Sequence, residues 1–357
     1  MEQQQTKDEL ERARRLVLQY GWNSTAYQII NPGMAHWFAA RGDALVGYVS
    51  SGSVCVVAGA PVAPENELVR VVEEFEACAA RNGQCVCYFG AEERLEAICR
   101  LLPNHSFLSL GAQPVWRPAR LAQNISAHAS LRAQLNRARN KGVVVSRWPA
   151  SKATRHPALQ GVLDAWLSTR GLPPMRFLVD PDTLIQLEDR MVFVAERDAM
   201  VVGFLVASPI PARQGWLIEQ VIRSPEAPNG VAESLIFSAA QTMAGEGFGY
   251  VTLGLAPLSR RAGNNEESAW WLRGTQGWVR AHGRRFYDFD GLDAFKAKFR
   301  PEEWTPVFAV ANQPTFSPRM LYAIAAAFSG GSPLRMIAWA LLRAARQEMH
   351  WMRTGRV

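Results

Sequence analysis

The chain has 357 residues, of which 48% are hydrophobic and 20% are charged. This length and composition suit two ordinary globular domains and exclude a largely disordered chain. The formal net charge is +7, and residues 313–357 hold six arginines and one glutamate, a net charge of +5. The basic character therefore belongs mainly to the C-terminal tail, and the rest of the chain is nearly neutral.

The first half of the sequence predicts a mixed α/β unit. Its expected elements are, in chain order, strands over 44–49 and 53–58, a loop over 59–64, a helix over 65–81, a strand over 84–89, a helix over 92–102 and strands over 107–110 and 113–116. The helix over 65–81 is amphipathic, and Asn82-Gly83 provides its stop signal.

A similar order of elements returns in the second half. A helix over 126–141, a strand over 143–148 and a helix over 157–169 lead into it. It then contains strands over 191–196, 201–207 and 215–222, a loop over 224–230, a helix over 231–245 and a strand over 249–255. Two runs of strand, strand, loop, helix and strand predict a tandem duplication of one α/β unit.

This order of elements resembles the GNAT acyltransferase fold. In that fold, a loop between the central strand and the following helix holds a pyrophosphate on its backbone amides. The corresponding loop here spans 223–230 and contains two prolines, Glu226 and a single glycine. Prolines remove N–H donors, and a carboxylate repels phosphate. We therefore expect the GNAT scaffold without acetyl-CoA, and no cofactor.

Cysteine usage and hydropathy limit the remaining classes. The five cysteines all precede residue 100 and have no histidine partners at zinc-finger spacing. We therefore expect no metal site, and reduced, buried thiols in a cytoplasmic protein. Residues 2–15 are polar and charged, unlike a signal peptide. Since no apolar run reaches the roughly 18–20 residues of a membrane span, we expect a chain that does not cross a membrane.

The segment 287–304 places a lysine on an apolar helix face. Leu292, Phe295 and Phe299 recur at helical spacing, and Lys296 falls on the same face, whereas Lys298 points elsewhere. An unpaired buried ammonium is costly. Lys296 therefore either snorkels at the edge of the core or serves a phosphate or carboxylate site. We predict that it lines a cavity between the two halves.

Three segments of the second half resemble the catalytic domain of the phosphatidylglycerol lysyltransferases, the multiple peptide resistance factor family: 218–230, 253–258 and 287–304. Residues 253–258 read Leu-Gly-Leu-Ala-Pro-Leu, close to the family's Leu-Gly-Met-Ala-Pro-Leu. The last segment is similar to the family's Tyr-x-Phe-x-Gly-Leu followed by Phe-Lys-x-Lys-Phe-x-Pro. A weaker likeness in the first half departs from the family at Ala60, where the family has an acid.

This resemblance implies two fused GNAT-like domains, and we place them at residues 1–120 and 121–312, followed by an amphipathic basic helical tail at 313–357. It also implies transfer of an amino acid from aminoacyl-tRNA to the headgroup of an anionic membrane lipid, phosphatidylglycerol. Family members often carry a multi-span flippase domain, and we expect this chain to modify lipid without translocating it. The amino acid carried and the oligomeric state stay open.

The predicted catalytic residues are Glu219, Arg223 and Lys296. Glu219 and Arg223 lie four residues apart on one face of a predicted strand. They form either a surface ion pair, or a base or amine anchor beside a phosphate or ester clamp. No Ser-His-Asp spacing is present. Because an aminoacyl ester is already activated, we expect direct transfer to the lipid hydroxyl.

The predicted substrate-binding residues lie on the basic helix 126–141, in the loop 223–230 and in the segment 287–304: Arg132, Arg139, Asn229, Tyr287, Asp290 and Lys298. The arginine face of the helix either contacts phosphates of the tRNA acceptor stem or is simply solvated.

The tail predicts a helix over 334–353 with an apolar face opposite an arginine face. This pattern is typical of a helix lying on anionic lipid, although a helix packed on the catalytic domain also produces it. The predicted membrane-binding residues are Arg335, Arg343, Arg346 and Arg353. We expect a cytoplasmic protein, peripheral on the inner face of the membrane. Two rival functions remain: transfer to a soluble or peptidoglycan acceptor, and a non-catalytic GNAT-like module that binds membrane or RNA.

Overall fold

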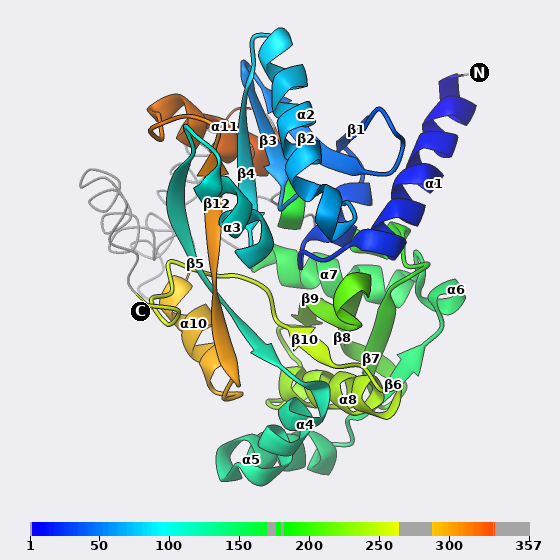
Figure 1. Cartoon of the computed structure of the whole chain (residues 1–357). Helices are drawn as coiled ribbons and strands as arrows, with labels where there is room; N and C mark the ends of the chain where they lie inside the picture. The colour runs from blue at the N-terminus through cyan, green and yellow to red at the C-terminus, as the bar shows by residue number, and fades with distance from the viewer. Residues whose placement is uncertain (1, 170–175, 180–181, 264–287, 331, 333–357) are drawn as a thin grey trace, which may run out of the picture.

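A computed structural model describes residues 2–169, 176–179, 182–263, 288–330 and 332 (Figure 1). The described strands form one sheet of 12 strands in the order β1-β2-β3-β4-β12-β5-β10-β9-β8-β7-β6, with β11 paired to β5. Helices cover both faces of this sheet (Figure 1). The molecule is therefore a mixed α/β protein, as the sequence predicts.

The first half contains, in chain order, α1 (Glu2–Tyr20), β1 (Ala35–Phe38), β2 (Leu45–Ser51), β3 (Val54–Ala58), α2 (Leu68–Arg81), β4 (Cys85–Ala91), α3 (Glu93–Leu101) and β5 (Ser106–Trp116). Strands β1, β2 and β3 are antiparallel, and α2 connects β3 to the parallel strand β4. Helix α2 ends where Asn82-Gly83 predicts, and Gly83 adopts a φ of +68° that suits glycine.

The rest of the chain contains α4 (Pro118–Ala127), α5 (Ala129–Asn140), β6 (Val144–Trp148), α6 (Ala150–Ala153), α7 (Pro157–Ser168), β7 (Met191–Arg197), β8 (Met200–Ile210), β9 (Gly215–Arg223), α8 (Val231–Gly245), β10 (Tyr250–Thr252), β11 (Ala256–Pro257), α10 (Phe289–Ala297), β12 (Glu303–Ala311) and α11 (Pro318–Ser329). Strands β6 to β9 are antiparallel, and α8 connects β9 to the parallel strand β10. Both halves therefore repeat antiparallel strands, a helix and a parallel strand, which confirms the predicted tandem architecture.

The two halves exchange their last strands. Strand β12, the last strand of the second half, pairs with β4 of the first half. Strand β5, the last strand of the first half, pairs with β10 of the second. Strands β12 and β5 also pair with each other, so hydrogen bonds run through the sheet without interruption. Because one sheet joins the two halves, the predicted domain limits at residues 120 and 312 remain predictions.

Apolar side chains on each face of the sheet pack against a separate group of helices. In the first half, α2 and α3 pack on one face, and α1 and α11 on the other. In the second half, α4, α5 and α8 pack on one face, and α7 on the other. Fully burying one valine or leucine side chain contributes about 1.5–3 kcal/mol, so these layers are the main source of stability.

Two predicted elements differ from the structure. The helix expected over 126–141 is α5, which begins only at Ala129, and the residues before it form a separate helix, α4. His128 between the two helices has an extended backbone with φ −80° and ψ 126°. The strand expected over 249–255 is shortened to β10, with Gly254 at a φ of +70° after it. Helix α11 packs against β2 and β3 of the first half. No helix among the described residues is long and apolar enough to span a membrane.

Candidate active site

Strand β9 carries a β-bulge at Glu219. Val206 of β8 pairs with Gln220, and the next residue of β8 pairs with Ile218, so Glu219 is the extra residue. A bulge re-aims a side chain, and bulges are frequent beside active sites. The side chain of Glu219 is only 6% exposed. It is therefore a buried group, and not part of a solvated surface ion pair.

Glu219 pairs with Arg190, whose side chain is completely buried. Arg190 Nε lies 3.2 Å from Glu219 Oε2 and 3.1 Å from Ser208 Oγ. Arg190 Nη2 donates to Asn31 Oδ1 at 2.9 Å, so one guanidinium joins the two halves. Among the described residues Glu219 Oε1 has no hydrogen-bond partner and is buried. This oxygen is available to accept a hydrogen bond from a substrate donor.

The sequence gives no signal for Arg190. It lies just before β7, in a stretch where no pattern stands out, and its partners Glu219 and Asn31 are 29 and 159 residues away. The neighbouring Asp189 accepts hydrogen bonds from Arg14 Nε at 2.6 Å and from Tyr27 Oη at 2.9 Å. Burial raises the pKa of Asp189, but these bonds and the Arg14 charge outweigh it and lower the pKa. Adjacent side chains thus hold the two halves in register.

Arg223 is the last residue of β9, four residues after the buried Glu219. It is exposed and pairs through its backbone with Gly203. The bulge at Glu219 interrupts the strict alternation that places the two residues on one face, and the structure buries one and exposes the other. Asn229, in the loop after β9, is exposed as well. Among the described residues, neither Arg223 nor Asn229 shares a hydrogen bond or ion pair with Glu219.

Lys296 is buried on α10, with 6% of its surface exposed. Its Nζ donates to Gly254 O at 2.8 Å and to Leu255 O at 2.7 Å. Burial lowers the pKa of Lys296 to about 7, although the nearby Asp293 charge raises it slightly. A neutral amine has two N–H donors and one lone pair. Both donors are satisfied by these carbonyls, and the lone pair is left to accept a proton.

This environment excludes one of the two interpretations of Lys296, the side chain that snorkels at the edge of the core. The side chain does not snorkel, because it is buried and its ammonium reaches backbone carbonyls. The predicted cavity between the two halves at this amine stays a prediction. The pair of carbonyls comes from the segment Leu253–Leu258 that the resemblance singles out, just before β11.

Lys298, two residues further on, pairs with a glutamate that the sequence did not mark. Lys298 Nζ lies 2.7 Å from Glu233 Oε1, and its charge also lies 4.0 Å from the ring centroid of Phe295. Glu233 is buried in the first turn of α8, where a carboxylate is favoured by the helix dipole. The pair joins α10 to α8 and so holds the helix of Lys296 in place.

The remaining predicted residues of this segment lie at the start of α10. Asp288 caps the helix by accepting from Gly291 N at 2.8 Å, and Asp290 is in the first turn. Tyr287 lies outside the described residues.

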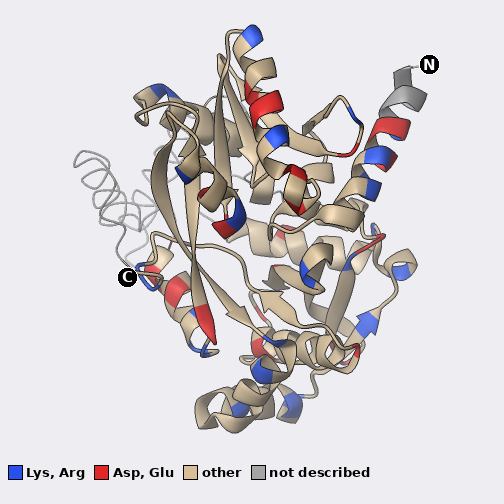
Figure 2. Cartoon of the chain, in the orientation of Figure 1, with Lys and Arg blue, Asp and Glu red and all other residues tan. Residues whose placement is uncertain are grey.

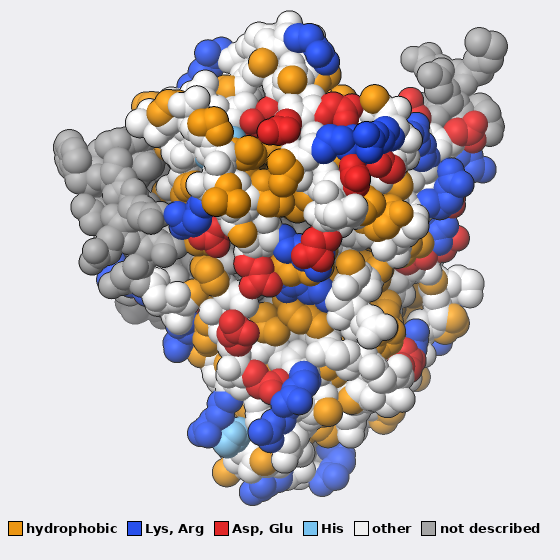
Figure 3. Space-filling view, in the orientation of Figure 1, with side chains coloured by type: hydrophobic (Ala, Val, Ile, Leu, Met, Phe, Trp, Pro, Cys, Tyr) orange, Lys and Arg blue, Asp and Glu red, His pale blue; other side chains and the backbone are white. Residues whose placement is uncertain are grey.

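Helix α5 presents the predicted basic face to solvent. Arg132 and Arg139 are exposed, while Leu131 and Ala138 are buried against α8 and its surroundings. Lys and Arg residues are frequent along α4 and α5 at the lower end of the molecule (Figure 2), and blue side chains gather at that end in the space-filling view (Figure 3). Such a surface suits phosphate contacts, which are long-range and need no pocket.

Helix α5 also covers the N-terminus of α8. Gly230, the N-cap of α8, has a φ of +96°, and a Cβ at this position would lie 2.0 Å from Gln134 O. In a GNAT fold this helix end is where a pyrophosphate would bind. Here backbone atoms of α5 lie against it, and Pro225 and Pro228 remove two amide donors from the preceding loop.

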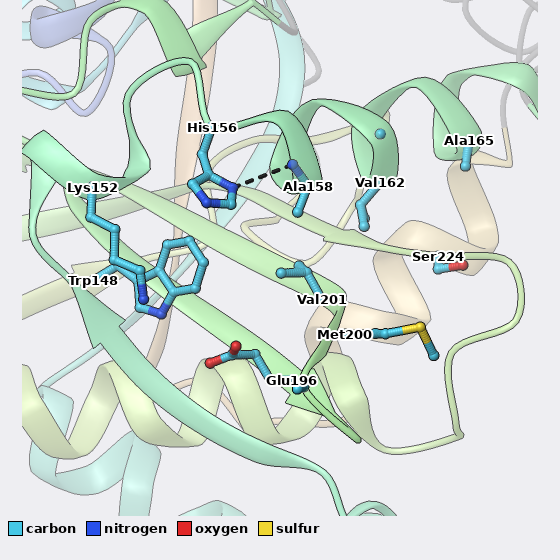
Figure 4. Close-up of a pocket in the computed structure, with 12 residues that line it drawn as sticks. Trp148, Lys152, His156, Ala158, Val162, Ala165, Glu196, Met200, Val201 and Ser224 are labelled. Atoms are coloured by element: carbon cyan, nitrogen blue, oxygen red, sulfur yellow. Dashed lines mark hydrogen bonds between the residues drawn. The ribbon is translucent and has the colours of Figure 1, made fainter.

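A separate pocket of about 590 Å³ opens between α7 and the tip of the β7–β8 hairpin (Figure 4). Its lining residues come from the second half alone: Trp148, Lys152, His156, Ala158, Gly161, Val162, Ala165, Glu196, Ala199, Met200, Val201 and Ser224. None of them is a predicted site residue, although Ser224 follows Arg223 directly.

The described residues contain no group of three or more His, Cys, Asp or Glu side chains that could hold a metal ion. The predicted membrane-binding residues lie outside the described residues: Arg335, Arg343, Arg346 and Arg353.

A family model described as "Phosphatidylglycerol lysyltransferase, C-terminal" matches residues 14–311. The lysylphosphatidylglycerol biosynthesis bifunctional protein LysX of Rhodococcus jostii is 25% identical over 311 residues, which cover 83% of this chain and 27% of that protein. Phosphatidylglycerol lysyltransferase of Bacillus subtilis is 23% identical over 299 residues, which cover 83% of this chain and 34% of that protein. The chain thus spans about a third or less of the length of these curated relatives.

Two solved structures share the fold along nearly the whole chain. One is the C-terminal domain (DUF2156) assigned to a lysylphosphatidylglycerol synthetase of Agrobacterium fabrum, with a TM-score of 0.75 and 24% identity, covering 91% of this chain and 98% of that one. The other is L-PGS from Bacillus licheniformis, with a TM-score of 0.71 and 21% identity, covering 94% and 96%.

Proposed function

The chain belongs to the family of phosphatidylglycerol lysyltransferase C-terminal domains, and we propose that it transfers an amino acid from aminoacyl-tRNA to the headgroup of phosphatidylglycerol. The lipid hydroxyl attacks the ester carbonyl, a new ester forms, and the ester to the tRNA ribose breaks. The hydroxyl proton passes through the enzyme to the departing ribose oxygen. One observation carries the proposal to this chain: a buried lysine, held by the carbonyls of Gly254 and Leu255, stands in the segment that carries the family resemblance.

In this proposal Lys296 is the general base. An efficient base has a pKa near the working pH, and burial places Lys296 there. Its two N–H donors are held by Gly254 O and Leu255 O, so the lone pair is oriented before substrate arrives. The same amine, once protonated, returns its proton to the leaving ribose oxygen. Lys298 and Glu233 act only by positioning α10.

Glu219 and Arg223 receive substrate roles. The buried, unpartnered Oε1 of Glu219 accepts from the α-ammonium of the aminoacyl group, while Arg190 holds the other oxygen. Arg223, exposed at the end of β9, binds a phosphate of the lipid or the tRNA. Arg132 and Arg139 on α5 contact the tRNA backbone, and Asn229, Asp290 and Tyr287 complete the substrate surface.

We also propose that the enzyme uses no CoA and works at the cytoplasmic surface of the membrane. Occlusion of the α8 N-terminus by α5 supports the first point, since a pyrophosphate there would meet Gln134 O. Calorimetric titration with acetyl-CoA should show no saturable binding at micromolar concentrations, and saturable binding would contradict this part of the proposal.

The test of the proposed function is a transfer assay with purified components. The full chain is incubated with tRNA charged with a radiolabelled amino acid and with vesicles containing phosphatidylglycerol, and label in the organic phase is measured. Lysine, alanine and arginine are tried in turn, and RNase treatment of the donor serves as the blank. Label that enters the lipid only with intact aminoacyl-tRNA supports the proposal. Label found only in a soluble acceptor, or no transfer with any donor, would overturn it.

A further inference from the structure

The pocket beside α7 has a charged end and an apolar end. In Figure 4, Trp148, Lys152 and Glu196 lie together at one end, while Ala165, Met200 and Ser224 lie toward the other. This pocket shares no residue with the proposed transfer site, so its role is an independent question. A volume of about 590 Å³ is ample for a small ligand.

The cation at the charged end, Lys152, is an exposed side chain that lies over a buried aromatic ring. Trp148 is only 6% exposed, and Lys152 Nζ stands 3.5 Å from the centroid of its ring. His156 meets the same ring edge-on at 5.0 Å. Cation–π contact fixes the ammonium without neutralising it, and among the described residues no carboxylate pairs with Lys152. The wall therefore offers a positioned, uncompensated positive charge.

His156 adds a second donor. Its Nδ1 accepts from Ala158 N at 3.3 Å and caps α7, so in the neutral ring the hydrogen is on Nε2. The positive end of the α7 dipole is at the same place. Lys152, His156 and the start of α7 together favour an anionic group.

An acid lies at the same end of the pocket as this cation. Glu196, at the end of β7, lines the same pocket, and no ion pair is formed by its carboxylate within the described part of the chain. Figure 4 shows its side chain on the same side of the pocket as Trp148 and Lys152. One pocket thus offers a carboxylate, Glu196, and an ammonium, Lys152, that do not form an ion pair with each other.

The remaining wall is small and apolar. Ala158, Gly161, Val162 and Ala165 recur along one face of α7, and Val201 and Met200 face them. A Cβ built on Gly161 would meet nothing within 4 Å, and Met200 is 68% exposed. The trough beside the charged end is therefore open, and it accepts an aliphatic segment.

We propose that this pocket binds a zwitterionic molecule with an aliphatic segment, its anionic group on Lys152 and His156, its ammonium on Glu196 and its apolar part along α7. A free aliphatic α-amino acid and an aminophospholipid with short chains share this chemistry. Neither an anion nor a cation alone satisfies both free charges.

Isothermal titration of the full chain with matched probes tests the proposal. L-leucine is compared with 4-methylpentanoate, which lacks the ammonium, and with 3-methylbutylamine, which lacks the carboxylate. Dihexanoyl-phosphatidylethanolamine below its micelle concentration is the lipid probe. We expect at least one zwitterion to saturate the site and both single-charge analogues to bind about tenfold more weakly or worse. Leucine and the lipid distinguish the two sources.

Variants locate the site. Gly161→Leu should abolish zwitterion binding by filling the trough, and it leaves the helix intact because the added side chain meets open space. Gly245→Leu, another open helical position on α8, is the control. Glu196→Gln and Lys152→Met should each weaken zwitterion binding about tenfold without removing transfer activity. The idea is overturned if neither zwitterion saturates the chain, if 4-methylpentanoate binds as well as leucine, or if Gly161→Leu binds like the unmodified protein.

Discussion

The two halves use one scaffold differently, and the clearest contrast is between β3 and β9. Both strands precede a helix that leads to a parallel neighbour. Strand β3 reads Val-Cys-Val-Val-Ala and is buried throughout, whereas β9 carries a bulged, buried Glu219 paired with Arg190. The first half thus places apolar packing where the second half places charge. Strand exchange between the halves makes the first a rigid support for the second.

The loops after these strands are alike in one respect. A Cβ on Gly59 would lie 2.4 Å from Thr25 Oγ1, and one on Gly230 would lie 2.0 Å from Gln134 O. In each half the chain's own atoms press against the loop glycine. Both halves keep the GNAT order of elements, and in both the protein's own atoms occupy the space beside this glycine. The scaffold is therefore kept without the open space that a ligand would need there.

Among the substitutions that test this difference between the halves, we expect the largest loss of transfer activity at Lys296. Lys296→Met removes the proposed base, and transfer should fall about 10²–10⁴-fold, the usual value of general-base catalysis. Because only the neutral amine accepts a proton, the rate of the unmodified protein should rise with pH and level off above about 7. Initial rates of the lipid-transfer assay from pH 5.5 to 8.5 measure both. Lys7→Met, on the exposed face of α1, is the control, and full activity of Lys296→Met would disprove the role.

Substitution of Arg190 tests how much the buried ion pair of the second half contributes to stability. Arg190→Met leaves Glu219 buried without its partner and should cost about 3–5 kcal/mol of unfolding free energy in urea. The double variant Arg190→Met, Glu219→Met should recover part of this loss, since no lone charge remains. Arg70, in a half-exposed network of the first half, is the comparison. Equal losses for Arg190→Met and Arg70→Met would refute the distinction.

Lys296 should also make stability depend on pH. The unfolded chain keeps the lysine proton up to about 10.5, whereas the folded chain releases it near 7. Between these values the unfolded state binds more protons, so stability rises with pH by at most about 1.4 kcal/mol per pH unit. Urea unfolding at pH 7 and pH 9 of the unmodified protein and Lys296→Met isolates this term. The same pH dependence in both would show that Lys296 titrates normally.

Alanine variants of Gly230 and Gly142 distinguish the stability cost of backbone strain from that of close packing. Both have positive φ, but a Cβ on Gly142 meets nothing within 4 Å. Gly142→Ala should cost about 1–2 kcal/mol for strain alone. Gly230→Ala should cost a further 1–3 kcal/mol, roughly the penalty of overpacking, because α5 must move away from α8. Thermal unfolding of the two variants side by side gives the difference, and equal costs would mean that α5 is not held against this helix end.

The smallest and most salt-dependent effect concerns the tail. Each arginine near an anionic surface adds about 1 kcal/mol at low salt, so removing residues 333–357 should weaken sedimentation with phosphatidylglycerol vesicles. The difference should shrink at high salt, where charges are screened. A variant with Arg335, Arg343, Arg346 and Arg353 changed to glutamine should lose most of the same binding. Sedimentation that is unchanged at every salt concentration would assign the tail to packing.

Local patterns were enough to predict much of this protein. Helical spacing placed Lys296 on the face that carries Phe299, and both side chains are buried. Alternation and turn residues predicted the repeated order of strands and helices. Such features follow from the period of a helix or strand and from backbone limits at glycine and proline, which act over a few residues. The resemblance in 253–258 and 287–304 rests on the same short range.

Tertiary structure alone decided the chemistry around these residues. Arg190 and Asn31 meet across 159 residues, Lys298 and Glu233 across 65, and β12 inserts between two strands of the first half. Helices α4 and α5 likewise both pack on α8, a helix about 100 residues further along the chain. Burial sets the pKa of Lys296, and burial is a property of the assembled core. No local pattern encodes it, because the desolvating atoms come from distant parts of the chain.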